Sequence, residues 1–186
     1  MVSLDVRKDL WAWYYGMRAF EHCKSCCDHI IKEKMTSEHP LYYSLNVAAA
    51  ISYGKPFRTS RGMERLSEDI IPAKYMNAHK QIMWYRDKIY AHTDVAENRS
   101  RTNRMVDVIF SFQKRGTHQF KKGFKLLEST VLPIGIERIS ELSERLVEKA
   151  HYYMDKILKR YGPDFPQTPG DYRIGIDPNE PPFTKI

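Results

Sequence analysis

Two long segments in which apolar residues recur every three or four positions constrain the fold of this chain more than any other feature. The first extends from about residue 3 to residue 34, and the second from about residue 136 to residue 160. Because an α-helix completes one turn in 3.6 residues, this spacing places the apolar side chains on one face. Each segment therefore predicts a long amphipathic helix with one face turned toward a protein core.

Shorter segments between these two also have helical patterns. Helices are predicted at residues 41–53, which include three consecutive alanines, and at residues 73–91, which follow Pro72. A short helical stretch is expected at about residues 63–71. Glycine and proline residues separate the segments, as is usual between helices. Four principal helices with mostly short connections predict an all-α fold in the form of an antiparallel bundle.

The segment before the last helix departs from the helical pattern. From Val106 to Phe112 bulky apolar side chains recur at every second position, and Gly116 follows as a turn residue. A period of two is typical of a β-strand, and residues 120–126 can form the return strand. A small inserted β-hairpin is therefore predicted within about residues 100–127.

The last part of the chain has a different composition. Six of the ten prolines lie between Pro163 and Pro182. Proline lacks a backbone N–H and breaks helices, so residues 163–186 are predicted to form an extended tail, either disordered or laid along the bundle. With 186 residues, the chain has the length of one domain, and residues 1–162 are predicted to form it.

Composition excludes some classes of protein. Hydrophobic residues make up 42% of the chain and charged residues 28%, which is ordinary for a folded globular protein. No apolar run approaches the roughly 18 residues of a membrane-spanning helix, so no membrane association is expected. The first residues show no secretory signal, and all three cysteines lie between Cys23 and Cys27. A reducing, cytoplasmic location is therefore expected.

The positive charge of the chain is concentrated in one segment. Residues 99–125 contain eight basic side chains and one acidic side chain, so their net charge of +7 equals that of the whole chain. This concentration predicts a polyanionic partner, either nucleic acid or an acidic protein surface, and the alternative is a solvated segment with no partner. The predicted nucleic-acid-binding residues are Arg99, Arg101, Arg104, Lys114, Arg115, Lys121 and Lys122.

Five side chains that can bind metal lie within eight residues of the first helix. A structural zinc site usually takes four ligands from two separated pairs, whereas one helix brings only two or three neighbouring ligands together. Cysteines on the buried face of a helix are more often small apolar packing residues. We therefore predict no metal site and no cofactor. The five residues are His22, Cys23, Cys26, Cys27 and His29.

The end of the helix predicted at residues 73–91 carries the strongest candidates for chemistry. The sequence has no glycine-rich phosphate loop, Gly-x-Ser-x-Gly elbow or His-Glu-x-x-His helix, which removes the commoner nucleotide-hydrolase, serine-hydrolase and zinc-protease functions. What remains is Arg86, then Asp87, and His92 six residues after the arginine. An arginine holds phosphate through a forked, permanently charged group, and a histidine transfers protons near neutral pH. Together they can cleave RNA without a metal.

An unbroken helix would keep these two groups apart. Six residues turn through about 600°, so Arg86 and His92 would point about 120° apart. A working site therefore needs a looser turn near Ala91 or a two-fold related second copy. His79 and Tyr90 lie near the same face as Arg86 and are predicted auxiliary groups. The alternative is that Arg86 pairs with a carboxylate and that His92 only ends the helix, where a cation suits the dipole.

Residues 86–94 read Arg-Asp-Lys-Ile-Tyr-Ala-His-Thr-Asp. This segment resembles the signature of the HEPN superfamily, which is an arginine, a polar residue, and a histidine four to six residues after the arginine. It is most similar to the abortive-infection type-U branch, and residues 52–57 resemble a second stretch of that branch. The resemblance implies a helical bundle that pairs through its motif helices, with Arg86 and His92 catalytic and Asp87 assisting.

The same resemblance implies a function. Many members of the superfamily are metal-independent ribonucleases of defence and toxin–antitoxin systems, so the expected activity is RNA cleavage at a composite site of a homodimer. The expected partners are RNA, a second copy of the chain, and an antitoxin or other protein. Because many members lack activity, the alternative is a non-catalytic module that binds nucleic acid or a partner protein. A third hypothesis is the nucleotide-binding partner of a toxin–antitoxin pair. The hairpin and the tail are additions to the minimal HEPN bundle.

Overall fold

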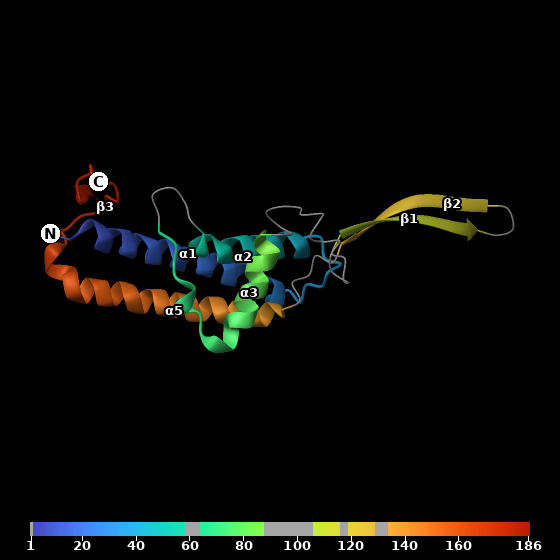
Figure 1. The fold of residues 1–186 in the computed structure, drawn as a ribbon, viewed down its shortest axis with the longest axis horizontal. Coiled ribbons are helices and arrows are strands. Elements are labelled where there is room, and N and C mark those ends of the chain that lie inside the picture. Colours follow the sequence, from blue (N-terminus) through green and yellow to red (C-terminus); the bar gives the residue numbers. More distant parts are fainter. Residues whose placement is uncertain (1, 59–63, 88–105, 116–118, 129–133) are drawn as a thin grey trace.

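The structure is a computed structural model, and the described part of the chain is mostly helical with one long antiparallel hairpin (Figure 1). This agrees with the predicted helical class. For the two strands of the hairpin, the backbone alone is described. The described residues are 2–58, 64–87, 106–115, 119–128 and 134–186.

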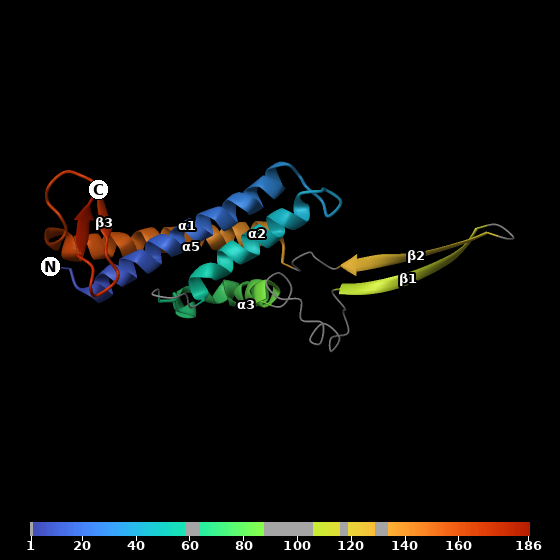
Figure 2. The same cartoon turned by 90° about the horizontal axis from the view of Figure 1, so that it is seen from above.

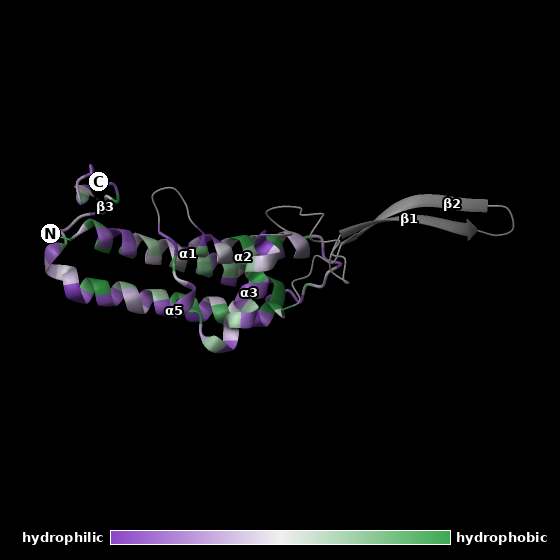
Figure 3. Cartoon of the chain, viewed as in Figure 1, coloured by the Kyte–Doolittle hydropathy of each residue, from purple (hydrophilic) through white to green (hydrophobic). Residues whose placement is uncertain are grey.

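The two longest helices, α1 (Leu4–Lys32) and α5 (Ile136–Tyr161), lie side by side and run in opposite directions (Figures 1 and 2). Both predicted long helices are therefore confirmed. The Ser3 hydroxyl accepts a hydrogen bond from the Val6 N–H and caps the first turn of α1. Hydrophilic and hydrophobic residues alternate along α5 in Figure 3, as its amphipathic pattern requires. Within the described ranges, no helix is both long enough and apolar enough to cross a membrane.

Two shorter helices cover part of this pair. Helix α2 (Tyr42–Gly54) packs on α1, and α3 (Met76–Tyr85) contacts α2. The helix predicted at residues 41–53 is confirmed. The one predicted at residues 73–91 starts with a 3₁₀ turn at Ala73–Tyr75 and becomes α-helical only at Met76. Its predicted last residues, 88–91, lie outside the described residues.

The helical stretch predicted at about residues 63–71 is wrong in extent. Residues 64–67 are not helical, and a single 3₁₀ turn forms at Glu68–Ile70. The Ser67 hydroxyl accepts a hydrogen bond from the backbone N–H of Asp69, which closes this one turn. Pro72 then favours an extended conformation for the residue before it, so the helix cannot continue.

The core includes buried side chains from α1, α2, α3 and α5. Its largest fully buried side chains include Phe20 from α1, Tyr53 from α2, Ile82 from α3 and Leu142 from α5. Cys23, Cys26 and Cys27 are buried among them, which confirms their prediction as packing residues. The alanines of α2 contribute two fully buried side chains, so α2 approaches α1 closely.

The predicted hairpin is confirmed and is longer than the sequence indicated. Strand β1 (Val106–Arg115) pairs with β2 (Gln119–Glu128), and Val106 lies opposite Glu128. Figures 1 and 2 show the two strands extending well beyond the helices. The basic positions within them are therefore carried on a projecting arm.

The tail contains regular structure that the sequence analysis did not predict. A 3₁₀ turn at Gly162–Asp164 follows α5, and β3 (Tyr172–Ile174) pairs antiparallel with β4 (Phe183–Lys185). The prediction of an extended tail is therefore incomplete. The prolines fall outside both short strands, so every strand residue keeps its backbone N–H. The Arg7 side chain of α1 donates a hydrogen bond to the Gly175 carbonyl, which ties the tail to α1.

Candidate functional site

Arg86 and Asp87 follow directly after the last residue of α3. The chain leaves the regular α-helix there and continues in a wider, π-type turn. Such turns within helices often occur at functional sites. Tyr90 and His92 themselves lie beyond the described residues, so their positions relative to Arg86 stay predictions.

The Asp87 carboxylate joins two arginines. Arg86 Nη1 donates to Asp87 Oδ1 at 2.5 Å, and Arg58 Nη2 donates to Asp87 Oδ2. The two guanidinium groups and one carboxylate have a net charge of +1. The side chains of Arg86, Asp87 and Arg58 are 21%, 27% and 40% exposed, respectively, so the cluster lies at the surface and remains open to solvent.

Arg58 is a site residue that the sequence analysis missed. It follows the 3₁₀ turn Lys55–Phe57, in which Phe57 is almost completely buried. The one signal in the sequence was its place directly after residues 52–57, the second stretch that resembles the HEPN branch. Nothing in the spacing of Arg58 and Asp87, 29 residues apart, indicates that they form an ion pair.

The stem of Arg86 lies across Gly54, the last residue of α2. A Cβ atom added to Gly54 would be 2.6 Å from Arg86 Cδ and 3.0 Å from Arg86 Nε. Any larger residue at position 54 would therefore push the arginine away. Among the residues that the structure describes, the buried Arg86 Nε has no hydrogen-bond partner. Burial, and then the positive charge of Arg58, lowers the pKa of Arg86, but a guanidinium remains charged at neutral pH.

His79, predicted as an auxiliary group, is fully buried beneath this cluster. Its Nδ1 lies 2.8 Å from the Tyr53 hydroxyl, its Nε2 lies 3.5 Å from Glu68 Oε2, and its ring meets Phe57 edge-on. Burial lowers the pKa of His79, which favours the neutral imidazole. Tyr53 and Phe57 flank Gly54 in the sequence. His79 therefore supports the segment that carries Gly54 rather than facing the surface.

The predicted nucleic-acid-binding residues lie in two groups. Arg99, Arg101 and Arg104 are among the residues that the structure does not describe. Positions 114, 115, 121 and 122 are in the hairpin, where Lys114 lies opposite Phe120 and Lys121 lies opposite Gln113. Neighbouring positions of a strand belong to opposite faces, so both faces of the arm carry basic positions.

The cysteine and histidine cluster of α1 is used for packing contacts. His22 Nδ1 lies 2.8 Å from the Ser52 hydroxyl, and Ser143 donates a hydrogen bond to Cys23 Sγ at 3.2 Å. A hydrogen bond that the Cys27 thiol donates to Cys23, together with burial, raises the pKa of Cys27, which disfavours the thiolate that binds metals. In the described part of the chain, no three His, Cys, Asp or Glu side chains are grouped as metal ligands would be.

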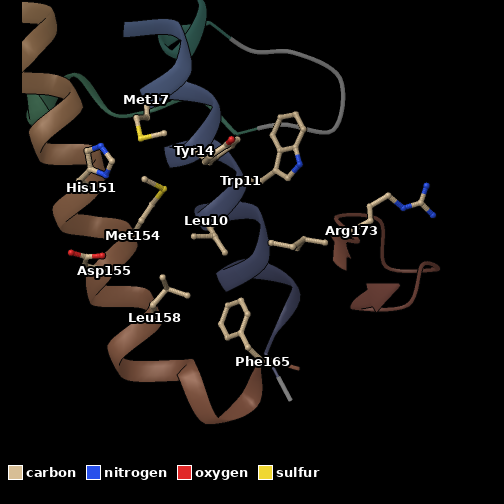
Figure 4. Close-up of a pocket in the computed structure, with 11 residues that line it drawn as sticks. Leu10, Trp11, Tyr14, Met17, His151, Met154, Asp155, Leu158, Phe165 and Arg173 are labelled. Carbon is tan, nitrogen blue, oxygen red and sulfur yellow. The ribbon is translucent and has the colours of Figure 1, made fainter. Parts of the chain in front are cut away.

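A second candidate is an apolar cavity of about 610 Å³ between α1, α5 and the tail (Figure 4). Its walls are mainly aliphatic, aromatic and thioether groups. Of the polar side chains, that of Arg173 points away from the cavity in Figure 4. The cavity thus has the volume of a ligand site but few polar groups that converge on one point. Its apolar walls include Leu10, Trp11, Met17, Met154, Leu158 and Phe165.

Comparisons with protein families, with curated proteins and with solved structures found no significant match to this chain. The functional argument therefore depends on the residues and their geometry.

Proposed function

We propose that this protein is a HEPN-like, metal-independent endoribonuclease of a defence or toxin–antitoxin system, with its helices in the antiparallel bundle of that superfamily. The observation that carries the proposal is the position of Arg86, which is fixed across Gly54 and held by Asp87 beside a second arginine. A partly exposed guanidinium fixed in this way is suited to binding a phosphate. The resemblance of residues 86–94 to the HEPN signature adds the proton-transfer group, His92.

In the proposed reaction, the ribose 2′-oxygen attacks the neighbouring phosphorus and the bond from phosphorus to the 5′-oxygen breaks. The 2′-hydroxyl loses its proton and the leaving 5′-oxygen gains one, giving a 2′,3′-cyclic phosphate and a 5′-hydroxyl. His92 performs one of these proton transfers, and in a two-fold dimer the partner subunit's His92 performs the other. Arg86 stabilises the charge that develops on the phosphate oxygens.

The proposal includes a homodimer that forms through the α3 region. One His92 per chain supplies one proton-transfer group, whereas the reaction moves two protons. A dimer would have a mass of about 44 kDa, twice the 22.0 kDa of the chain, and sedimentation at micromolar concentration would measure it. The basic arm formed by β1 and β2 would then contact the RNA backbone on either side of the site.

Cleavage of a labelled RNA in excess EDTA tests the proposal. The wild-type protein should form 2′,3′-cyclic phosphate ends, and His92→Ala should lower the rate by roughly 10²–10⁴-fold while RNA affinity stays nearly unchanged. His151→Ala, at an exposed histidine of α5, is the matched control and should cleave at the wild-type rate. Cleavage that EDTA abolishes would contradict the metal-independent mechanism.

A non-catalytic module that binds RNA or a partner protein is the second candidate. The observation that favours it is the Arg86–Asp87 ion pair, because a carboxylate already occupies one side of the guanidinium. A binding module needs Arg86 for affinity but has no use for proton transfer by His92. Wild-type protein that binds RNA and leaves it intact, with or without EDTA, would establish this function instead.

A further inference from the structure

We propose that Arg58 and Arg86 together bind one phosphate group of the RNA, with Asp87 holding the two guanidinium groups at a fixed separation. This inference rests on the proposed function for the identity of the ligand. It adds a second phosphate-binding residue, Arg58, which lies outside the 86–94 motif. It also gives Asp87 a positioning role in place of a direct contact with RNA.

The first argument is charge. Two guanidinium groups repel each other, and the single Asp87 carboxylate between them leaves a net charge of +1. A phosphodiester carries one negative charge. One RNA phosphate would therefore neutralise the cluster, whereas the same two arginines without Asp87 would have a net charge of +2.

The second argument is the number of hydrogen-bond donors. Each guanidinium has five N–H groups in a planar fork. Asp87 accepts one hydrogen bond from Arg58 and one from Arg86, and both arginine side chains are partly exposed. Within the described part of the chain, donors of both forks therefore remain to face a ligand. Two forks on one tetrahedral phosphate can contact several of its oxygens at once, which a single lysine cannot do.

The third argument is rigidity. The stem of Arg86 lies against Gly54, and Arg58 follows the buried Phe57. The backbone N–H of Arg58 also donates to the Lys55 carbonyl at 3.2 Å, which closes the turn before it. Because both cations are held before the ligand arrives, binding loses less conformational entropy than it would with two free arginines.

A double-mutant cycle on RNA affinity tests the inference. The probe is a fluorescein-labelled 2′-O-methyl oligoribonucleotide, which lacks the attacking hydroxyl and cannot be cleaved by the proposed reaction. Arg58→Ala and Arg86→Ala should each weaken binding about tenfold, an interaction of about 1.4 kcal/mol. If both arginines hold one phosphate, the double variant should be far less than 100-fold weaker, because the second loss removes a contact that the first has already impaired.

The dependence of affinity on salt gives an independent readout. Each single variant should lower the log–log slope by about 0.7, the value for one phosphate contact on a single strand, and the double variant should lower it no further. Lys80→Ala, which removes one positive charge from an exposed position of α3, is the matched control and should change neither affinity nor slope as strongly. Arg58→Gln keeps a donor for Asp87 and should still lose the affinity that Arg58 supplies.

Additive losses in the cycle, or an Arg58→Ala variant that binds as Lys80→Ala does, would overturn the inference. Because Arg58 and Arg86 share Asp87, the effects of their substitutions can also be coupled in the protein without RNA. Urea unfolding of the four proteins of the cycle measures that coupling separately from the coupling in RNA binding. Wild-type protein that shows the coupled losses but cleaves no RNA would contradict the proposed nuclease and support the phosphate site. Normal cleavage by Arg58→Ala would support the proposed nuclease and contradict the phosphate site.

Discussion

Two arginines at different places in the molecule, Arg7 and Arg86, show how a structural cation differs from a candidate functional one. Arg7, which is 5% exposed, donates to the neutral carbonyl of Gly175 and joins the tail to α1. Arg86 is partly exposed and shares a carboxylate with a second cation, Arg58. The contact of Arg7 stabilises the fold directly. The positions of Arg86 and Arg58, in contrast, bring two positive charges close together, and a bound anion would neutralise their excess charge.

The surroundings of the two arginines differ in the same way. Beside the tail that Arg7 holds, there is a cavity of about 610 Å³ with mainly apolar walls. At the end of α3, the polar groups of Arg58, Arg86 and Asp87 converge on one point. The two candidate sites therefore differ in kind, because one is an apolar cavity and the other is a cluster of charged groups.

Among variants that leave the proposed RNA-contacting side chains in place, the largest effect is expected for Gly54→Ala, because a Cβ atom there would displace Arg86. A displacement of about 1 Å at a reacting group can lower a rate about 10²-fold. The free energy of unfolding should not fall, because alanine is favoured over glycine in a helix by up to about 1 kcal/mol. Cleavage rates and urea unfolding test both expectations.

The matched control for Gly54→Ala is Gly162→Ala at the end of α5. A Cβ atom at Gly162 would have no other atom within 4 Å, so this variant should cleave RNA at the wild-type rate. Equal rates for the two variants would contradict the role given to the contact between Gly54 and Arg86.

Arg7→Ala should have the opposite profile. It leaves the Gly175 carbonyl without its charged donor, and loss of such a hydrogen bond lowers the free energy of unfolding by about 1.5–3 kcal/mol. RNA cleavage at a temperature where the variant is folded should stay at the wild-type rate. Arg18→Ala, which removes an arginine that is 65% exposed, should destabilise the fold by less. A loss of catalysis in folded Arg7→Ala would remove the distinction between the two arginines.

A smaller effect, on the free energy of unfolding, is expected from the protonation of His79, which is buried beneath the cluster of Arg58, Arg86 and Asp87. Its pKa is lowered in the folded protein, so as the pH falls the unfolded chain binds this proton first, near the ordinary pKa of about 6.5. Stability that is present above pH 6.5 should therefore decline below it, by at most about 1.4 kcal/mol per pH unit for this group. Urea unfolding between pH 7.5 and 5.5 should show a weaker decline for His79→Gln than for the wild type. An identical decline would mean that other groups cause it.

How much of this could be predicted from the sequence differs between regions. The long helices and the hairpin follow from periods of 3.6 and two residues that persist over many positions. Gly54 directly follows the helix predicted at residues 41–53, and α2 ends there, but its contact with Arg86 arises from packing between distant segments. The pairing of Arg58 with Asp87 has the same origin. The strands of the tail sheet have three residues each, too few to show a period.

Replacement of each arginine by lysine, followed by RNA cleavage in excess EDTA, tests the central claim most directly. Arg86→Lys keeps the positive charge but loses the fork, so the rate should fall by about 10²–10³-fold, as when one donor to the transition state is removed. Arg7→Lys should cleave at the wild-type rate. Cleavage by folded Arg86→Lys at the wild-type rate, or equal losses in both variants, would contradict the proposal that RNA is cut at the cluster of Arg58, Arg86 and Asp87.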